Sequence, residues 1–139
     1  MVLDGISKKN FVIIGRVGMD FCPDPPGTAT QDAHSMFVSM GGSSANIAAG
    51  LGKFGCRTAL VTCVSDDAVG WYCLNQLDHY GVERTHVRKV TGEARTSLAI
   101  YESRVENHQS VIYRNNAADF QMSIADVEAI DYSQFGALI

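Results

Sequence analysis

Three features of the sequence could together bind the hydroxyl groups of a small molecule. Asp20 stands shortly after the apolar run 11–14, at the carboxyl edge where open α/β sheets bind ligands. The pair Gly41-Gly42 precedes a helical pattern, lets the backbone approach a ligand and provides a flexible joint. Asn46, on the first turns of that helix, offers one hydrogen-bond acceptor and two donors. An ordinary turn aspartate and an ordinary helix cap stay open as alternatives.

Two arginines could bind an anionic group. Arg16 follows the apolar run 11–14, and Arg114 follows a second β-rich run at 110–113. A guanidinium group forms paired hydrogen bonds with a carboxylate or a phosphate. A surface ion pair with a protein carboxylate is the alternative interpretation for each arginine.

A glycine motif at 50–55 matches G-x-G-x-x-G, the pattern of a dinucleotide site. Such a site needs a strand before the glycines and a helix that opens at them, because the helix N-terminus holds the pyrophosphate. Here a helical pattern comes before the glycines and a strand pattern after them. We therefore interpret these glycines as small residues for close packing and for a helix end.

The elements that must position these residues can be predicted from hydrophobic periodicity. The predicted strands are 11–14, 35–40, 58–64, 82–90, 96–101 and 110–113. The predicted helices are 44–54, 69–80 and 123–130. A loop is predicted at 22–32, which contains all three prolines. This alternation favours an α/β fold with a mostly parallel sheet and helices on both faces. The runs 96–101 and 110–113 predict an antiparallel hairpin apart from that sheet.

Details of the helices follow from single residues. In the helix 44–54, Ser43 or Ser44 is expected to form the N-cap. Its apolar residues Ile47, Leu51 and Phe54 would share one face. The next helix is expected to begin at a capping aspartate, residue 66 or 67. The last helix has an aspartate at position 126, where a capping box prefers Glu.

Composition and charge exclude several classes of partner. The chain has 139 residues, with 15 acidic against 11 basic side chains and a formal net charge of −4. This balance gives no attraction to nucleic acid or to an anionic membrane. The longest uncharged stretch, 33–52, has glycines, serines and an asparagine at its centre, which excludes it as a membrane span. We therefore expect a cytoplasmic protein with neither partner.

Two further features bear on metal sites and on the extent of the chain. The four cysteines, Cys22, Cys56, Cys63 and Cys73, contain no C-x-x-C pair, which predicts free thiols and no metal site. The last residues, 137–139, are typical of the opening of a buried strand. We therefore expect this chain to be the N-terminal portion of a longer protein.

Several short motifs, in their order and spacing, resemble a known family. They are Gly41-Gly42-x-x-x-Asn46-x-Ala48, Gly55, the segment Val64-Ser65-Asp66-Asp67 with Gly70, and Tyr80-Gly81-Val82. From about residue 11 to residue 139, the chain resembles the N-terminal part of ribokinase-like, or PfkB-type, carbohydrate kinases. Ser44 and Ser65 depart from the family's first signature, and its second signature, Asp-Thr-x-x-Gly-Ala-Gly-Asp, is absent.

The resemblance implies an ATP- and Mg²⁺-dependent sugar kinase, with the sugar-binding side in residues 1–139. Asp20 and Asn46 would bind sugar hydroxyls, and Gly41 and Gly42 would form a hinge and line the site. Strands near 34–40 and 96–114 would form a β lid over the sugar, through which a homodimer is expected by analogy. The catalytic base and most of the ATP pocket would lie beyond residue 139, so this chain alone would be inactive.

Within the family, two segments most resemble kinases of acidic sugars such as 5-dehydro-2-deoxygluconate and 2-keto-3-deoxygluconate. They are Ile14-Gly15-Arg16 with the later Asp20, and the segment 113–119. Arg114 would then face the sugar carboxylate. The alternatives are a fructokinase- or ribokinase-type kinase of neutral sugars, a non-catalytic sugar-binding module and, least favoured, a dinucleotide-binding oxidoreductase domain.

Overall fold

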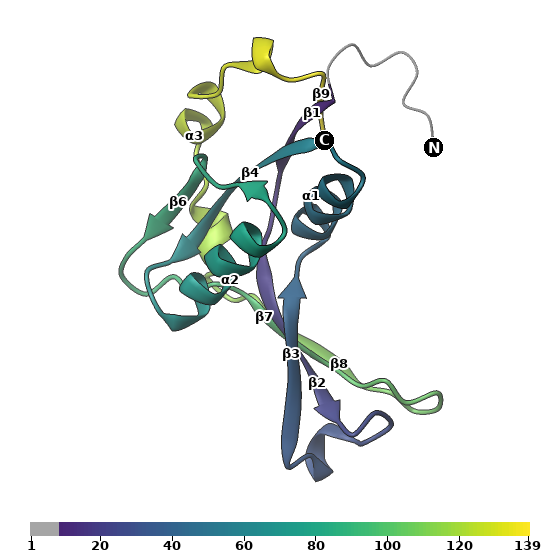
Figure 1. Ribbon diagram of the computed structural model, residues 1–139. Helices are drawn as coiled ribbons and strands as arrows, with labels where there is room; N and C mark the ends of the chain where they lie inside the picture. Colours follow the sequence, from purple (N-terminus) through teal and green to yellow (C-terminus); the bar gives the residue numbers. More distant parts are fainter. Residues whose placement is uncertain (1–8) are drawn as a thin grey trace.

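The main sheet is built from the apolar runs of the sequence (Figure 1). The computed structural model describes residues 9–139, so residues 1–8 of the predicted domain range lie outside the described part. The strands are β1 (Asn10–Ile14), β4 (Arg57–Ser65), β5 (Val82–Glu83), β6 (Val87–Val90) and β9 (Ala137–Leu138). β1 pairs with β4 on one side and with β9 on the other, and β5 and β6 both pair with β4. All of these pairings are parallel, as the alternation of strands and helices predicts.

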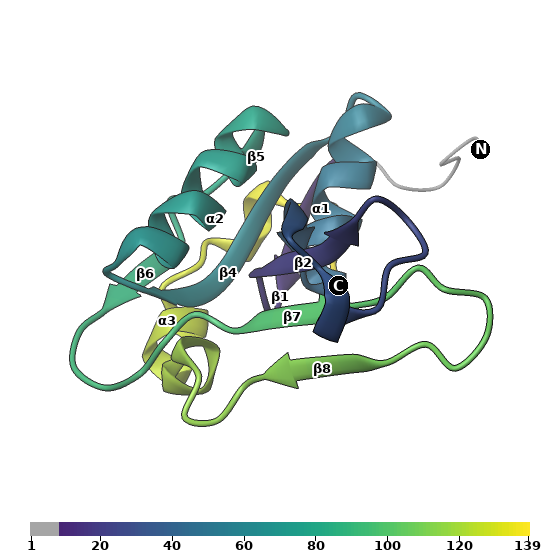
Figure 2. The same ribbon diagram turned by 90° about the horizontal axis from the view of Figure 1, so that it is seen from below.

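Side chains alternate between the two faces of this sheet, and each face is covered. The helices are α1 (Ser43–Lys53), α2 (Ala68–His79) and α3 (Ile124–Glu128). Leu60 and Val64 of β4 belong to the core cluster that contains residues of α1 and α2. Val12 and Val61 pack with Ile130 on the other face. Figure 2 shows α1, α2 and α3 as three separate helices around β4. The predicted α/β fold is therefore confirmed.

The helices form where the sequence predicts them, but α1 buries a different face. The buried residues of α1 are Ala45, Ala48 and Ala49. In contrast, Ile47 is 42% exposed and Phe54 is 80% exposed. Small side chains let the helix lie close to the sheet, and of the predicted face Leu51 alone packs partly against the core. Within residues 9–139, the helices are too short or too polar to cross a membrane.

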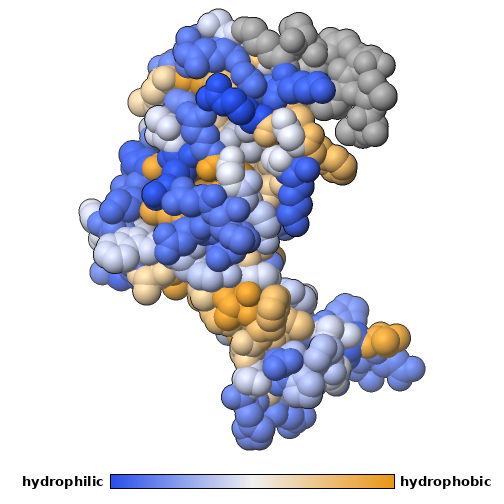
Figure 3. All heavy atoms as spheres, in the orientation of Figure 1, coloured by the Kyte–Doolittle hydropathy of each residue, from blue (hydrophilic) through white to orange (hydrophobic). Residues whose placement is uncertain are grey.

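A second, smaller sheet projects from the larger part of the molecule (Figure 1). Its strands are β2 (Gly18–Asp24), β3 (Ser35–Gly41), β7 (Leu98–Tyr101) and β8 (Ser110–Tyr113), in the order β3-β2-β7-β8. β2 and β3 form one antiparallel pair, β7 and β8 form the other, and β2 and β7 join them in parallel. The predicted hairpin of 96–101 and 110–113 is thus present and apart from the main sheet. Figure 3 shows hydrophobic atoms where the small sheet leaves the larger part.

Strand β2 was not predicted, because part of it falls in the range predicted as a loop. Pro23 lies within it, opposite Met36 of β3. The pairing of β2 with β7 ends earlier, at Phe21, so the missing N–H of Pro23 removes no hydrogen bond from that side. A proline that would disrupt a fully paired strand is therefore tolerated here.

Of three local predictions, the first is corrected and the other two are borne out in their elements. The range predicted as one strand, 82–90, forms β5 and β6, separated by a turn in which the N–H of Val87 donates to the carbonyl of Arg84 at 2.9 Å. At the start of α3, Asp126 accepts hydrogen bonds from the backbone N–H and the hydroxyl of Ser123 at 2.7 and 2.8 Å, so an aspartate does complete the capping box. The final residues form the predicted strand, since β9 pairs in parallel with β1, and Leu138 is 54% exposed.

Candidate functional site

The junction between β3 and α1 requires glycine at position 42. Gly42 has a φ of +98°, a left-handed conformation that favours glycine. A Cβ on Gly42 would lie 2.4 Å from the carbonyl oxygen of Arg16, which also accepts a hydrogen bond from the N–H of Ala45 at 3.3 Å. Gly42 itself is the N-cap of α1 and supplies no side-chain bond, so the predicted serine cap is wrong. The residues after β1 are thereby held against the start of α1.

The carboxylate of Asp20 lies directly over Gly41. A Cβ on Gly41 would be 1.9 Å from Oδ1 of Asp20 and 2.5 Å from its Oδ2. Burial raises the pKa of the Asp20 carboxyl above its usual value, and the Arg16 guanidinium lowers it in part. The same carboxylate adds to burial in raising the pKa of the Cys73 thiol of α2 to about 12. Asp20 is thus a half-buried acid at the junction of the small sheet with the helices.

Asn46 follows the glycine pair in the sequence and lies in the first turn of α1. Its side chain is exposed, and its backbone N–H donates to the carbonyl of Gly42 at 2.9 Å in the first turn of α1. Asn46 and Ser39 line the same cavity of about 220 Å³, together with Tyr80 and others. Ser39 also stands opposite Asp20 in the β2–β3 ladder. Ser39 therefore lies beside Asp20 in the sheet and borders the same cavity as Asn46.

Arg16 is held by Ser97, a residue that the sequence analysis did not identify. Nη1 of Arg16 donates to the hydroxyl oxygen of Ser97 at 3.2 Å, and Ser97 is 1% exposed. The carbonyl of Ser97 accepts from the N–H of Met19 at 3.1 Å. Among residues 9–139, Arg16 forms no ion pair, and its charge acts on Asp20. This arginine thus remains available for an anionic ligand.

Arg114 is already engaged with a protein carboxylate. It directly follows the last ladder pair of β7 and β8, which joins Leu98 to Tyr113. Both its Nε and its Nη2 donate to Oδ2 of Asp119, the former at 3.2 Å, and its guanidinium carbon lies 4.5 Å from the ring centroid of Phe120. The alternative interpretation of Arg114, an ion pair, is therefore what the structure contains.

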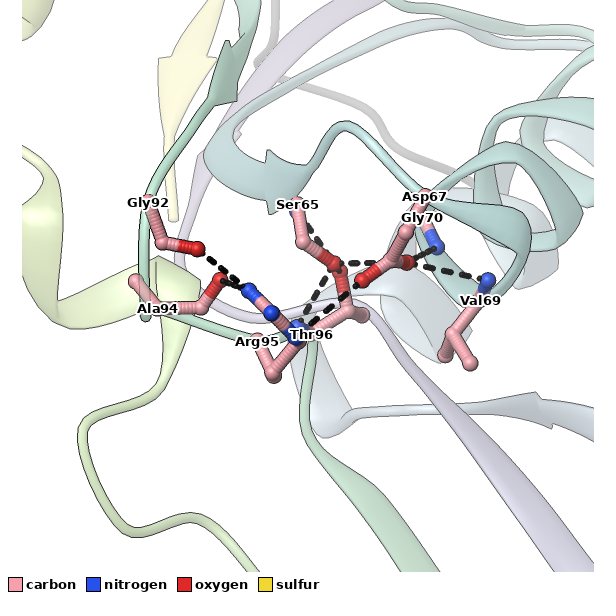
Figure 4. A network of polar contacts seen from close by, with 8 residues as sticks. All are labelled: Ser65, Asp67, Val69, Gly70, Gly92, Ala94, Arg95 and Thr96. Atoms are coloured by element: carbon pink, nitrogen blue, oxygen red, sulfur yellow. Dashed lines mark hydrogen bonds and ion pairs between the residues drawn. The ribbon is translucent and has the colours of Figure 1, made fainter.

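A buried hydrogen-bond network connects the end of β4 with the segment that precedes β7 (Figure 4). The hydroxyl oxygens of Ser65 and Thr96 lie 2.8 Å apart. Each backbone N–H of this pair donates to the hydroxyl of the other, Ser65 to Thr96 at 2.8 Å and Thr96 to Ser65 at 2.9 Å. The hydroxyl of Ser65 donates to Oδ1 of Asp67 at 2.9 Å, and the same oxygen accepts from the amides of Val69 and Gly70 at 3.1 Å. Asp67 thus caps α2, as predicted.

Comparison with known proteins decides the family. Residues 8–139 match the pattern described as pfkB family carbohydrate kinase. The chain belongs to this family. Among curated pfkB-like relatives, it is 31% identical to 5-dehydro-2-deoxygluconokinase of Mesomycoplasma hyopneumoniae (strain 7448), over 88% of this chain and 36% of that protein. It is 29% identical to 5-dehydro-2-deoxygluconokinase of Photobacterium profundum, over 92% of this chain and 39% of that protein.

Solved structures share the pfkB fold. A PfkB protein from Polaromonas sp. JS666 superposes with a TM-score of 0.77 and 22% identity, over 89% of this chain and 40% of that chain. A sugar kinase from Pyrococcus horikoshii, solved in complex with ATP, superposes with a TM-score of 0.75 and 21% identity, over 89% and 39% of the two chains. The chain therefore spans well under half the length of the relatives that it matches.

The glycine motif at 50–55 and the cysteines do not form the ligand sites that their patterns could suggest. The motif Gly50 to Gly55 lies at the end of α1 and before β4, so it offers no helix N-terminus to a pyrophosphate. The cysteines are free thiols, and Cys56, Cys63 and Cys73 are buried. Within residues 9–139, no three His, Cys, Asp or Glu side chains are grouped so that they could hold a metal ion.

Proposed function

We propose that this chain is the sugar-binding half of a cytoplasmic, ATP-dependent kinase that phosphorylates a primary hydroxyl of an acidic sugar such as 5-dehydro-2-deoxygluconate. The observation that carries the proposal is the packing of the Asp20 carboxylate on Gly41, with Arg16 and its unpaired charge on the same segment. The names of the curated relatives support the substrate class.

Each residue of the site has a proposed task. The carboxylate of Asp20 accepts hydrogen bonds from sugar hydroxyls, and the amide of Asn46 holds further hydroxyls from the start of α1. Arg16 binds the sugar carboxylate, and Arg114 reaches it by exchanging its bond to Asp119 for a bond to the ligand. A half-buried setting strengthens these contacts because it removes competing water.

The small sheet is proposed as a lid that turns about Gly41 and Gly42. Gly42 already adopts a φ of +98°, which other residues reach only with strain. Closure over the sugar would exclude water, which competes with the sugar hydroxyl for the phosphoryl group. The exposed apolar side chains Phe37, Ile112 and Tyr113 support a homodimer through the same sheet.

The phosphoryl-transfer machinery is proposed for other parts of the whole protein. ATP, with Mg²⁺, supplies the phosphoryl group in the proposed reaction. The described residues do not fit a metal site, since they contain no group of ligands for one. The catalytic base is likewise expected beyond residue 139. The part of this chain is therefore to bind and orient the sugar and to exclude water.

One observation favours a second candidate, a kinase of neutral sugars. Arg114 is neutralised by Asp119 in this structure, and an arginine used in this way does not need a substrate carboxylate. The two candidates differ in the charge of the sugar that binds.

The test compares an acidic with a neutral sugar. Titration calorimetry with 5-dehydro-2-deoxygluconate and with fructose is expected to show tighter binding of the acidic sugar by the whole protein that contains these 139 residues. Arg16→Ala and Arg114→Ala should each reduce that preference, and Asp20→Ala should weaken both sugars because it removes the acceptor of their hydroxyls. Equal affinity of the unaltered chain for the two sugars would exclude the acidic-sugar proposal.

A further inference from the structure

The segment Arg95-Thr96-Ser97 is the point where the main sheet meets the small sheet. Ser65, the last residue of β4, bonds to Thr96 through the reciprocal pair described above. On another side, the N–H of Ala118 donates to the carbonyl of Arg95 at 2.8 Å. The next residue, Ser97, accepts from Met19 of β2 through its carbonyl and from Arg16 through its hydroxyl. Any shift of this segment would therefore move the group that holds Arg16.

The direction of each hydrogen bond in the network follows from its chemistry. The carboxylate of Asp67 can only accept, so the hydroxyl of Ser65 must give its proton to Asp67. The oxygen of Ser65 is then an acceptor toward Thr96, whose hydroxyl donates to it. The chain of donors runs from Thr96 through Ser65 to Asp67. Ser65 and Thr96 are 1% and 5% exposed, so water cannot replace these bonds cheaply.

We propose that Ser65 is a positioning residue for Arg16: with Thr96 it forms a latch that fixes Ser97, and Ser97 orients the guanidinium toward the anionic group of the sugar. This inference rests on the proposed function, because it assigns that group to Arg16. The latch acts mainly on specificity, since the side chain of Ser97 contacts Arg16 directly, whereas Ser97 reaches the strand of Asp20 through its carbonyl bond to Met19. Loss of the latch should therefore weaken acidic sugars more than neutral ones.

Two substitutions on β4 separate this role from general stability. Ser65→Ala removes the hydroxyl at the centre of the latch. Thr62→Val is the matched control on the same strand, because the Thr62 hydroxyl is equally buried but has no hydrogen-bond partner among the described residues. Thr96→Ser keeps the latch hydroxyl and should behave as the unaltered chain, while Thr96→Val should reproduce Ser65→Ala.

The measurement is calorimetric affinity for 5-dehydro-2-deoxygluconate and for fructose, with thermal unfolding as a check of folding. Ser65→Ala is expected to weaken the acidic sugar by about three- to tenfold, the effect of one ordinary hydrogen bond, because Arg16 is displaced and not removed, and to weaken fructose less. Thr62→Val should change neither. Amide exchange at Thr96 should be faster in Ser65→Ala than in Thr62→Val. If Ser65→Ala does not fold, the comparison of Thr96→Val with Thr96→Ser decides the question in the same way.

The outcomes distinguish this inference from the proposed function. If Arg16→Ala leaves the preference for the acidic sugar intact, the assignment of Arg16 fails and the latch has no role in specificity. If Arg16→Ala removes the preference but Ser65→Ala does not, the proposed function stands and the positioning role is overturned. Equal weakening of both sugars by Ser65→Ala would show a merely structural residue and would also overturn it.

Discussion

Replacing Gly41 with alanine should dislodge the Asp20 carboxylate without unfolding the protein. The new Cβ would stand 1.9, 2.3 and 2.5 Å from Oδ1, Cγ and Oδ2 of Asp20, and real Cβ contacts under 3.0 Å are essentially never seen. The carboxylate must therefore move by at least about 1.1 Å, from 1.9 Å to 3.0 Å. The backbone itself accepts alanine, since Gly41 does not have a left-handed φ.

The displacement should affect ligand binding far more than stability. The three nearest atoms all belong to the end of one flexible side chain, which can swing away at a stability cost of about 1 kcal/mol or less. Hydrogen bonds to a charged acceptor contribute roughly 1.5–3 kcal/mol. At about 1.4 kcal/mol for each factor of ten, their loss weakens sugar affinity by about 10- to 150-fold.

A double-mutant cycle measures this effect. Calorimetric affinities for 5-dehydro-2-deoxygluconate are compared in the unaltered chain, Gly41→Ala, Asp20→Ala and the double variant. In the Asp20→Ala background the new methyl group meets no carboxylate, so Gly41→Ala should cost almost nothing there. If Gly41→Ala weakens binding equally in both backgrounds, contact with Asp20 is not the cause and the reasoning is refuted.

Three further predictions concern charge and packing. Burial raises the pKa of Asp20, so sugar affinity should fall as the pH is lowered through that raised pKa. Arg16 lowers the pKa of Asp20, so Arg16→Ala should shift the midpoint of this affinity–pH curve, measured by calorimetry, to higher pH. The pKa of Glu102 is lowered to about 2, mainly because the backbone amide of Thr30 donates to its carboxylate. The ionised carboxylate therefore stabilises the fold above the usual pKa of a glutamate, and this stabilisation is lost near pH 2. Glu102→Gln should speed amide exchange at Thr30. Leu60 is fully buried, so Leu60→Ala should lower the unfolding free energy of the protein by roughly 2–5 kcal/mol, as measured by urea denaturation.

The sequence predicts best those elements whose signal is local. β1 and β4 are apolar runs buried on both faces, which need no knowledge of their partners to be identified. Asp67 caps α2 through amides two and three positions later, again a local interaction. β2 escaped prediction because Pro23 is tolerated only where β7 no longer pairs, a fact of tertiary structure.

The candidate site was predictable in its residue types but not in its contacts. Asp20 and Gly41 could be chosen from their places in the sequence, yet nothing in their spacing shows that one lies on the other. Ser65 and Thr96 carry no motif that predicts a bond between them, because their meeting depends on how two sheets join. The pairing of Arg114 with Asp119 was an open alternative, and only the turn after β8 decides it.

The pairing of β2 with β7 also bears on the order in which the chain acquires its structure. Each hairpin of the small sheet joins strands that are close in the sequence. In contrast, the pairing of Met19 in β2 with Leu98 in β7 closes a long loop that contains α1, β4 and α2. The entropic penalty of closing a loop grows with its length, and such long-range pairings slow folding. We infer that the larger sheet must first bring the two hairpins together, so the pairing of β2 with β7 forms late in folding.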